Sequence, residues 1–240
     1  MRNELTAFRE NIRFGYRNYI RQHRYLRELV AVVLFNIFFY GLLYGDKAED
    51  ATWAVLIVFA VLLNLITAPS IFFWDRGNTL YFLLSQPQGR KRLFFSKICL
   101  IILIDLFWMG LFAALYGLRF LSWHYFLWLP LRLSVVALIL ALCTALISFS
   151  FSYRPFWSWI ILALIIFGFI LNKQALFPID LPNEIYKLFA LLLPPLLELT
   201  RFCTTLQNNL WLAGFLVLAL LQSFILLRIS YRRVERKDFV

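Results

Sequence analysis

Charged residues are scarce in this chain. They make up 15% of its 240 residues, whereas hydrophobic residues make up 62% and the mean hydropathy is +0.75. A soluble domain carries about 25% charged and about 45–50% apolar residues. This composition excludes an ordinary soluble domain and indicates an integral membrane protein. We also expect no cleavable signal peptide, because residues 1–28 are polar and rich in arginine.

Residues that carry catalysis or hold metals are equally sparse. The three cysteines are scattered and form no CxxC pair, and there are only two histidines, His23 and His124. None of the nine glycines begins a GxxxxGK[ST] phosphate loop, and no GxSxG or HExxH motif occurs. We therefore expect no catalysis, no metal and no bound cofactor in this chain. If ATP drives its function, another polypeptide must bind the nucleotide.

Long apolar runs fill most of the sequence. A bilayer core of about 30 Å needs roughly 20 apolar residues in each helix. Six runs approach that length: Leu29–Tyr44, Thr52–Trp74, Phe95–Leu118, Phe126–Ser150, Pro155–Asn172 and Leu210–Ile229. They predict an all-α membrane protein with six transmembrane helices in a domain over residues 29–229. An even number of spans places both termini on the same side.

The basic residues are divided unequally between the two predicted faces. Residues 1–28, 75–97, 153–154 and 228–240 hold 18 of the 24 lysines and arginines. The positive-inside rule makes that face cytoplasmic, and the tail over residues 230–240 lies there too. This predicts a multi-pass protein of the inner (cytoplasmic) membrane. It also explains the basic net charge without a nucleic-acid partner.

The polar amino-terminal segment has a helical pattern of its own. Apolar residues recur at helical spacing, at Leu5, Phe8, Ile12, Tyr16, Tyr19 and Ile20, and five arginines follow a neighbouring stripe. An amphipathic helix of this kind can lie in the inner interface. Two interpretations stay open: a plain orientation anchor, or a connector helix that also contacts a cytoplasmic partner. Gly15 weakens the helix by roughly 1 kcal/mol relative to alanine.

The predicted cytoplasmic loop over residues 75–97 combines helix breakers with a short apolar face. Leu80, Leu83 and Leu84 share one face of a helix that Pro87 would stop. The full pattern reads Asp75, Gly77, Thr79, Leu80, Leu83, Leu84, Ser85, Pro87, Arg90 and Lys97. It resembles the cytoplasmic loop of ABC-type exporter permeases of the type-2 family, which includes haem exporter permeases. Asn78 departs from the family pattern by standing between the glycine and the threonine.

The resemblance implies an architecture and a set of partners. The loop would form a coupling helix that docks on a separate ATP-binding subunit, which holds ATP and Mg. A second permease, identical or related, would complete the translocation pathway within the lipid bilayer. Residues 173–209 would contain a re-entrant helical pair on the outer side, between spans 5 and 6. Within them, Ile185–Phe202 holds two apolar halves that meet at Pro194 and Pro195, where a turn is required.

A few polar residues fall inside the apolar runs. Asp105 is the acidic residue well inside a span, and intramembrane ionisable groups are costly and functionally suspect. Two interpretations of Asp105 stay open. In a functional role it binds a cation or relays protons. In a structural role it is protonated, or hydrogen-bonded to a polar group on a neighbouring helix. Weaker candidates for a pathway lining or for helix contacts are Asn36, Asn64, Thr67 and Gln222.

Two other classes of protein compete with the exporter permease. A membrane enzyme or assembly scaffold without an ATPase would need a polar catalytic cluster, and Asp105 stands alone in the sequence. An ion-coupled secondary transporter often shows inverted repeats, which the two halves of this chain lack. The substrate stays open among haem, lipid, polysaccharide, drug and peptide, and His124 is the one outer-face candidate for a haem ligand.

Overall fold

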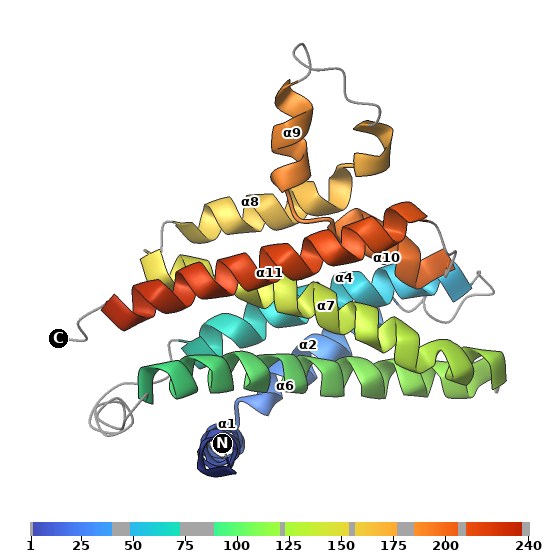
Figure 1. Ribbon diagram of the computed structural model, residues 1–240. Coiled ribbons are helices and arrows are strands. Elements are labelled where there is room, and N and C mark those ends of the chain that lie inside the picture. Colours follow the sequence, from blue (N-terminus) through green and yellow to red (C-terminus); the bar gives the residue numbers. More distant parts are fainter. Residues whose placement is uncertain are drawn as a thin grey trace.

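The protein is described by a computed structural model that covers residues 2–39, 49–72, 89–120, 123–153, 157–176, 185–205 and 210–236. Within these ranges every regular element is helical (Figure 1). The elements are α1 (Arg2–Arg21), α2 (Tyr25–Phe38), α4 (Glu49–Phe72), α6 (Gly89–Phe120), α7 (Trp123–Tyr153), α8 (Trp157–Ile170), the 3-10 turn η1 (Lys173–Leu176), α9 (Ile185–Leu192), α10 (Leu196–Thr205) and α11 (Leu210–Arg236). The all-α prediction is confirmed.

Among the described residues, four helices are long and apolar enough to cross a membrane. The apolar segments are Thr52–Phe72 of α4, Gly89–Leu118 of α6, Trp123–Ser150 of α7 and Ala213–Glu235 of α11. These correspond to four of the six predicted spans. The other two coincide with α2 and α8, which have 14 residues each and fall short of the roughly 20 that a span needs. The count of six spans therefore stays a prediction.

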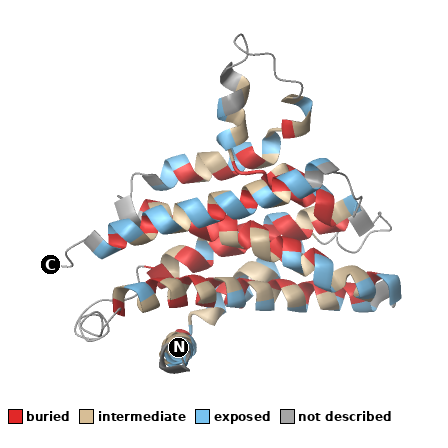
Figure 2. Cartoon of the chain, in the orientation of Figure 1, coloured by how far each residue is buried: buried red, intermediate tan, exposed pale blue. Residues whose placement is uncertain are grey.

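The long helices differ in how deeply they are buried. Of the most apolar window of each helix, 67% is buried in α7 and 61% in α4, against 22% in α11. Figure 2 shows the buried residues concentrated where the long helices face one another. α7 packs against α4, α6, α8, α10 and α11. It is therefore the central helix of the bundle, and α11 is peripheral.

α1 runs across the bundle instead of along it. Figure 1 views α1 nearly end-on, whereas the long helices lie across the page. It packs on α6, and a Cβ atom built on Gly15 would lie 2.9 Å from Cδ2 of Leu100. The glycine that weakens the helix in isolation thus lets α1 approach α6 closely.

The predicted amphipathic helix ends earlier than its sequence pattern indicates. α1 stops at Arg21, and α2 begins at Tyr25 after a turn in which His23 has a φ of 52°. A positive φ is uncommon outside glycine, although histidine is among the residues enriched there. We call the turn Gln22–Arg24 the elbow. It lets the chain change direction from the crosswise α1 into α2.

The chain also turns where the proline pair predicts it. α9 ends at Leu192 and α10 begins at Leu196, with Pro194 and Pro195 between them. Both prolines are buried, whereas α9 projects from the bundle at the top of Figure 1. A helix–turn–helix is therefore present at this position, and its insertion into the membrane stays a prediction.

Candidate functional site: a buried polar cluster

The predicted coupling residues fall almost entirely outside the described part of the chain. These are Asp75, Gly77, Thr79, Leu80, Leu83, Leu84, Ser85 and Pro87. Arg90 is described, in the first turn of α6, and its guanidinium donates a hydrogen bond to the carbonyl of Glu235. It therefore fastens the start of α6 to the end of α11.

Two of the predicted intramembrane polar residues, Asn64 and Asp105, meet Thr144 in the centre of the bundle. The amide nitrogen of Asn64 on α4 donates to Oδ2 of Asp105 on α6 at 2.7 Å and to the hydroxyl of Thr144 on α7 at 2.9 Å. All three side chains are completely buried. Hydrogen bonds between buried side chains are stronger than bonds exposed to water, so this group ties three long helices together.

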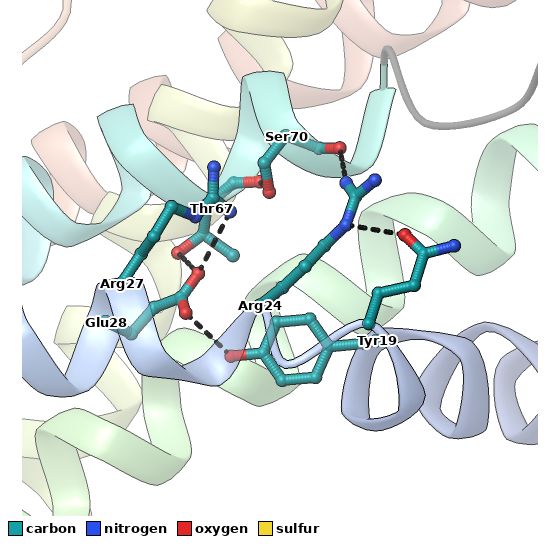
Figure 3. A network of polar contacts seen from close by, with 7 residues as sticks. Tyr19, Arg24, Arg27, Glu28, Thr67 and Ser70 are labelled. Atoms are coloured by element: carbon teal, nitrogen blue, oxygen red, sulfur yellow. Dashed lines mark hydrogen bonds and ion pairs between the residues drawn. The ribbon is translucent and has the colours of Figure 1, made fainter.

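Glu28 extends the polar group toward α1. It lies in the first turn of α2 and is completely buried. The hydroxyl of Tyr19 donates to its Oε2 at 3.0 Å, and the hydroxyl of Thr67 lies 3.5 Å from its Oε1 (Figure 3). Thr67 lies three residues beyond Asn64 on α4, on the same face of the helix. We call Tyr19, Glu28, Asn64, Thr67, Asp105 and Thr144 the polar cluster; it joins five helices.

Two arginines at or next to the elbow bind residues in or near this cluster. Arg27 forms an ion pair with Oε1 of Glu28 at 3.6 Å, and Arg24 donates to the carbonyl of Ser70 on α4 at 2.5 Å (Figure 3). Burial and the neighbouring Glu28 carboxylate raise the pKa of Tyr19, so the phenol stays a donor. The elbow is thus held to α4 by Arg24 within it and by Glu28 at the start of α2.

Two oxygen atoms of the cluster lack a hydrogen-bond partner among the described residues. They are Oδ1 of Asp105 and Oδ1 of Asn64, both fully buried. An unsatisfied buried polar atom costs about 1–3 kcal/mol. A proton on Asp105, or a small cation held by oxygen atoms, would remove that cost. No group of three or more His, Cys, Asp and Glu side chains that could hold a metal occurs in the described chain.

Gln222 and Asn36 take no part in the cluster. The side-chain amide of Gln222 on α11 lies 3.2–3.5 Å from the carbonyls of Leu191, Leu192 and Leu193. It therefore caps the end of α9 instead of lining the cluster. Asn36 is half-buried on α2, two turns beyond Glu28.

The turn between α9 and α10 is a second polar junction, which we call the prolyl turn (Leu193–Pro195). The ammonium group of Lys173 donates to the carbonyl of Leu193, and Oε1 of Glu198 accepts from the backbone amide of Lys173 at 2.6 Å. Burial lowers the pKa of Lys173 to about 8, with Glu198 opposing the shift. A Cβ on Gly168 would lie 2.8 Å from the carbonyl oxygen of Pro194. α8 is thus packed directly on the prolyl turn.

Sequence reasoning found half of the polar cluster. Asn64, Thr67 and Asp105 were identified as polar residues inside apolar runs. Glu28 was missed because an acidic residue in the first turn of a helix is ordinary, and Tyr19 because it fits the apolar stripe of α1. Thr144 carried no signal, since a threonine inside an apolar run is common.

Searches among known protein families, curated proteins and solved structures found no match to this chain. The function must therefore be argued from the geometry and from the sequence of the predicted loop over residues 75–97.

Proposed function

We propose that this chain is the transmembrane permease subunit of an ATP-driven exporter in the inner membrane. The observation that carries the proposal is the attachment of α1: a basic amphipathic helix crosses the bundle and is tied to α4 through Glu28. A connector helix that passes movement from a cytoplasmic ATPase to the spans needs such a rigid attachment. The loop pattern from Asp75 to Arg90 supplies the matching docking element.

The proposed assembly contains two permeases and two ATP-binding subunits. One chain has fewer spans than the usual twelve of the permease family that its loop resembles, and large apolar side chains are exposed on its outer helices. On α8 they include Trp159 and Phe167, and on α11 Leu220 and Phe224. In this assembly such faces meet lipid or the second permease, and the ATP-binding subunits hold ATP and Mg.

The proposed topology has six spans, with α2 and α8 completing the four long helices and with both termini cytoplasmic. A single cysteine placed at position 48 should react with a membrane-impermeant reagent only from the outside, and one placed at position 238 only from the inside. Reaction of position 48 only from the cytoplasm would contradict six spans.

Docking of the loop is tested by putting charge into its apolar face. Replacing both Leu83 and Leu84 with aspartate should abolish co-purification of an ATP-binding subunit, because desolvating an unpaired carboxylate costs several kcal/mol. The matched control replaces Ser85 and Gln86, which lie off that face by helical spacing, with aspartate. Equal co-purification of both double variants would refute the coupling role, provided that both insert at the wild-type level.

One observation favours a second function, ion-coupled transport without an ATPase. The unpaired oxygens of Asn64 and Asp105 would suit a transported proton or monovalent cation. Under this alternative, Asp105→Asn abolishes transport and no ATP-binding subunit co-purifies. Co-purification of such a subunit with the wild-type chain therefore separates the two candidates.

A further inference from the structure

A cavity of about 1040 Å³ lies between α1 and α6, and Figure 1 places α1 against α6 at the edge of the bundle. Small-molecule sites typically measure about 300–1,000 Å³, so this one is large enough for a bulky ligand. One wall is built from α1 and carries charge, and the other is built from α6 and is apolar.

The charged wall is formed by two arginines one helical turn apart. Arg9 and Arg13 both line the cavity, together with Glu10. Residues four apart share a face of a helix, so the two guanidinium groups lie close together. Neither has an ion-pair partner among the side chains that the structure describes. This wall carries a net positive charge and suits a phosphate group.

The apolar wall continues beyond the cavity along α6. Leu103 and Phe107 line the cavity, and further residues at helical spacing extend the same exposed stripe toward the far end of the helix. The stripe consists of Leu103, Phe107, Leu111, Leu115 and Leu118, whose side chains are 40–63% exposed. A ligand with a long hydrocarbon chain can follow this stripe after leaving the cavity.

Contacts next to the cavity hold α1 in place. α1 touches α6 at Gly15 and Leu100, and its far end is held by the hydrogen bond from Tyr19 to Glu28. Tyr19 also lines the cavity. An occupant therefore contacts a member of the polar cluster directly.

We propose that this cavity binds one anionic phospholipid. Its phosphate contacts Arg9 and Arg13, and its acyl chains lie along the stripe on α6. The charge on one wall and the hydrocarbon surface on the other match the two halves of such a lipid. Binding holds α1 against the bundle through a ligand as well as through Glu28.

The test uses the full chain purified in detergent and reconstituted in nanodiscs of phosphatidylcholine with a minority of phosphatidylglycerol. Native mass spectrometry of the released protein should find one phosphatidylglycerol per wild-type chain. The double variant Arg9→Gln/Arg13→Gln should retain it about thirtyfold more weakly, which corresponds to about 1 kcal/mol for each arginine. The matched control, Arg17→Gln/Arg21→Gln, removes the same charge from the same helix away from the cavity and should retain the lipid.

A second variant tests the apolar wall. Leu103→Trp narrows the cavity next to α6 and leaves both arginines in place, so it should also weaken retention of the lipid. If Arg9→Gln/Arg13→Gln fails to insert, two other variants test whether the lipid binds in the cavity. They are Leu103→Trp and Arg9→Lys/Arg13→Lys, which keeps the charge.

Three results would overturn the proposal. Equal loss in the two arginine double variants would show attraction to a charged surface instead of a site. Undiminished retention in Leu103→Trp would place the lipid elsewhere, and exclusion of phosphatidylglycerol in favour of a bound peptide would identify a protein ligand. Lipid retention needs no ATPase, so it is independent of the proposed transport function.

Discussion

The elbow and the prolyl turn are two junctions in the same chain that are held in different ways. Beside the elbow the carboxylate of Glu28 accepts from the side chains of Tyr19 and Thr67, and Arg24 donates to the carbonyl of Ser70. At the prolyl turn the side chains of Lys173 and Gln222 donate to backbone carbonyls at the end of α9, and Glu198 accepts from the amide of Lys173. The main acceptor is therefore one buried side chain at the elbow and the backbone of the chain at the prolyl turn.

The two junctions also differ in how closely their surroundings are packed. The elbow borders the cavity between α1 and α6, whereas the prolyl turn is packed so closely that Gly168 leaves no room for a methyl group. The elbow therefore borders free volume, whereas the prolyl turn is closely packed on α8.

The largest effect is expected from removing the acceptor at the elbow. Glu28→Ala leaves Tyr19 and Thr67 without a buried partner and should lower the free energy of unfolding by about 3 kcal/mol. Glu28→Gln keeps an acceptor and should cost about 1 kcal/mol. Thermal unfolding in detergent, followed by tryptophan fluorescence, measures both. Equal stability of wild type and Glu28→Ala would show that the elbow is held by other contacts.

The next effect comes from crowding the prolyl turn. Gly168→Ala drives a methyl group toward the backbone of Pro194 and should cost about 1–3 kcal/mol. Gly214→Ala is the matched control, because a Cβ there meets nothing within 4 Å. It should be neutral or stabilise the helix by up to about 1 kcal/mol. If the two alanines had equal effects in the same unfolding assay, the turn would be looser than its packing indicates.

A smaller difference should separate two residues of the polar cluster. Asn64→Leu removes the donor to both Asp105 and Thr144 and should cost about 1–2 kcal/mol. Asp105→Asn keeps an oxygen acceptor and should change stability by less than about 0.5 kcal/mol. Chemical unfolding in mixed detergent micelles measures both variants. A larger loss in Asp105→Asn than in Asn64→Leu would mean that the carboxyl group itself is essential to packing.

The smallest effect is a difference in pH dependence between the junctions. The pKa of Lys173 is about 8 in the folded protein and 10.5 ordinarily, so between these values the unfolded chain binds more protons and stability rises with pH. The pKa of Tyr19 is raised above its ordinary value of 10, so above about pH 10 the folded chain binds more protons and stability falls.

Melting temperature measured from pH 7.5 to 11 checks both signs. Lys173→Gln should remove the rise in melting temperature between pH 8 and 10, and Tyr19→Phe should remove the fall at higher pH. A wild-type profile whose shape neither substitution alters would contradict both assignments.

The polar residues show where sequence reasoning reached and where it stopped. Asp105, Asn64 and Thr67 stand out in the sequence because polar groups inside apolar runs are costly. Glu28 was hidden at the start of an apolar run, and its role depends on Tyr19 and Thr67, which are 9 and 39 residues away in the chain. Pairing at such separations is decided by packing, and no local pattern records it.

The helices, in contrast, could largely be predicted from the sequence. Apolar runs alone predicted α4, α6, α7 and α11, because a helix that buries its backbone in hydrocarbon needs only length and hydropathy. The proline pair predicted the turn between α9 and α10, because proline cannot continue the hydrogen bonding of a helix. These properties belong to short stretches of chain and can be deduced without knowledge of their neighbours.

Tertiary structure alone decided which helix is central, where α1 crosses α6 and which side chains meet. Gly15 weakens the isolated helix, but in the fold it lies where a Cβ atom would come within 2.9 Å of Leu100. Arg9 and Arg13 read as part of a basic stripe, but the fold places them on a cavity whose other wall is α6. Each of these outcomes depends on contact between segments far apart in the sequence, which exists only once the helices have packed.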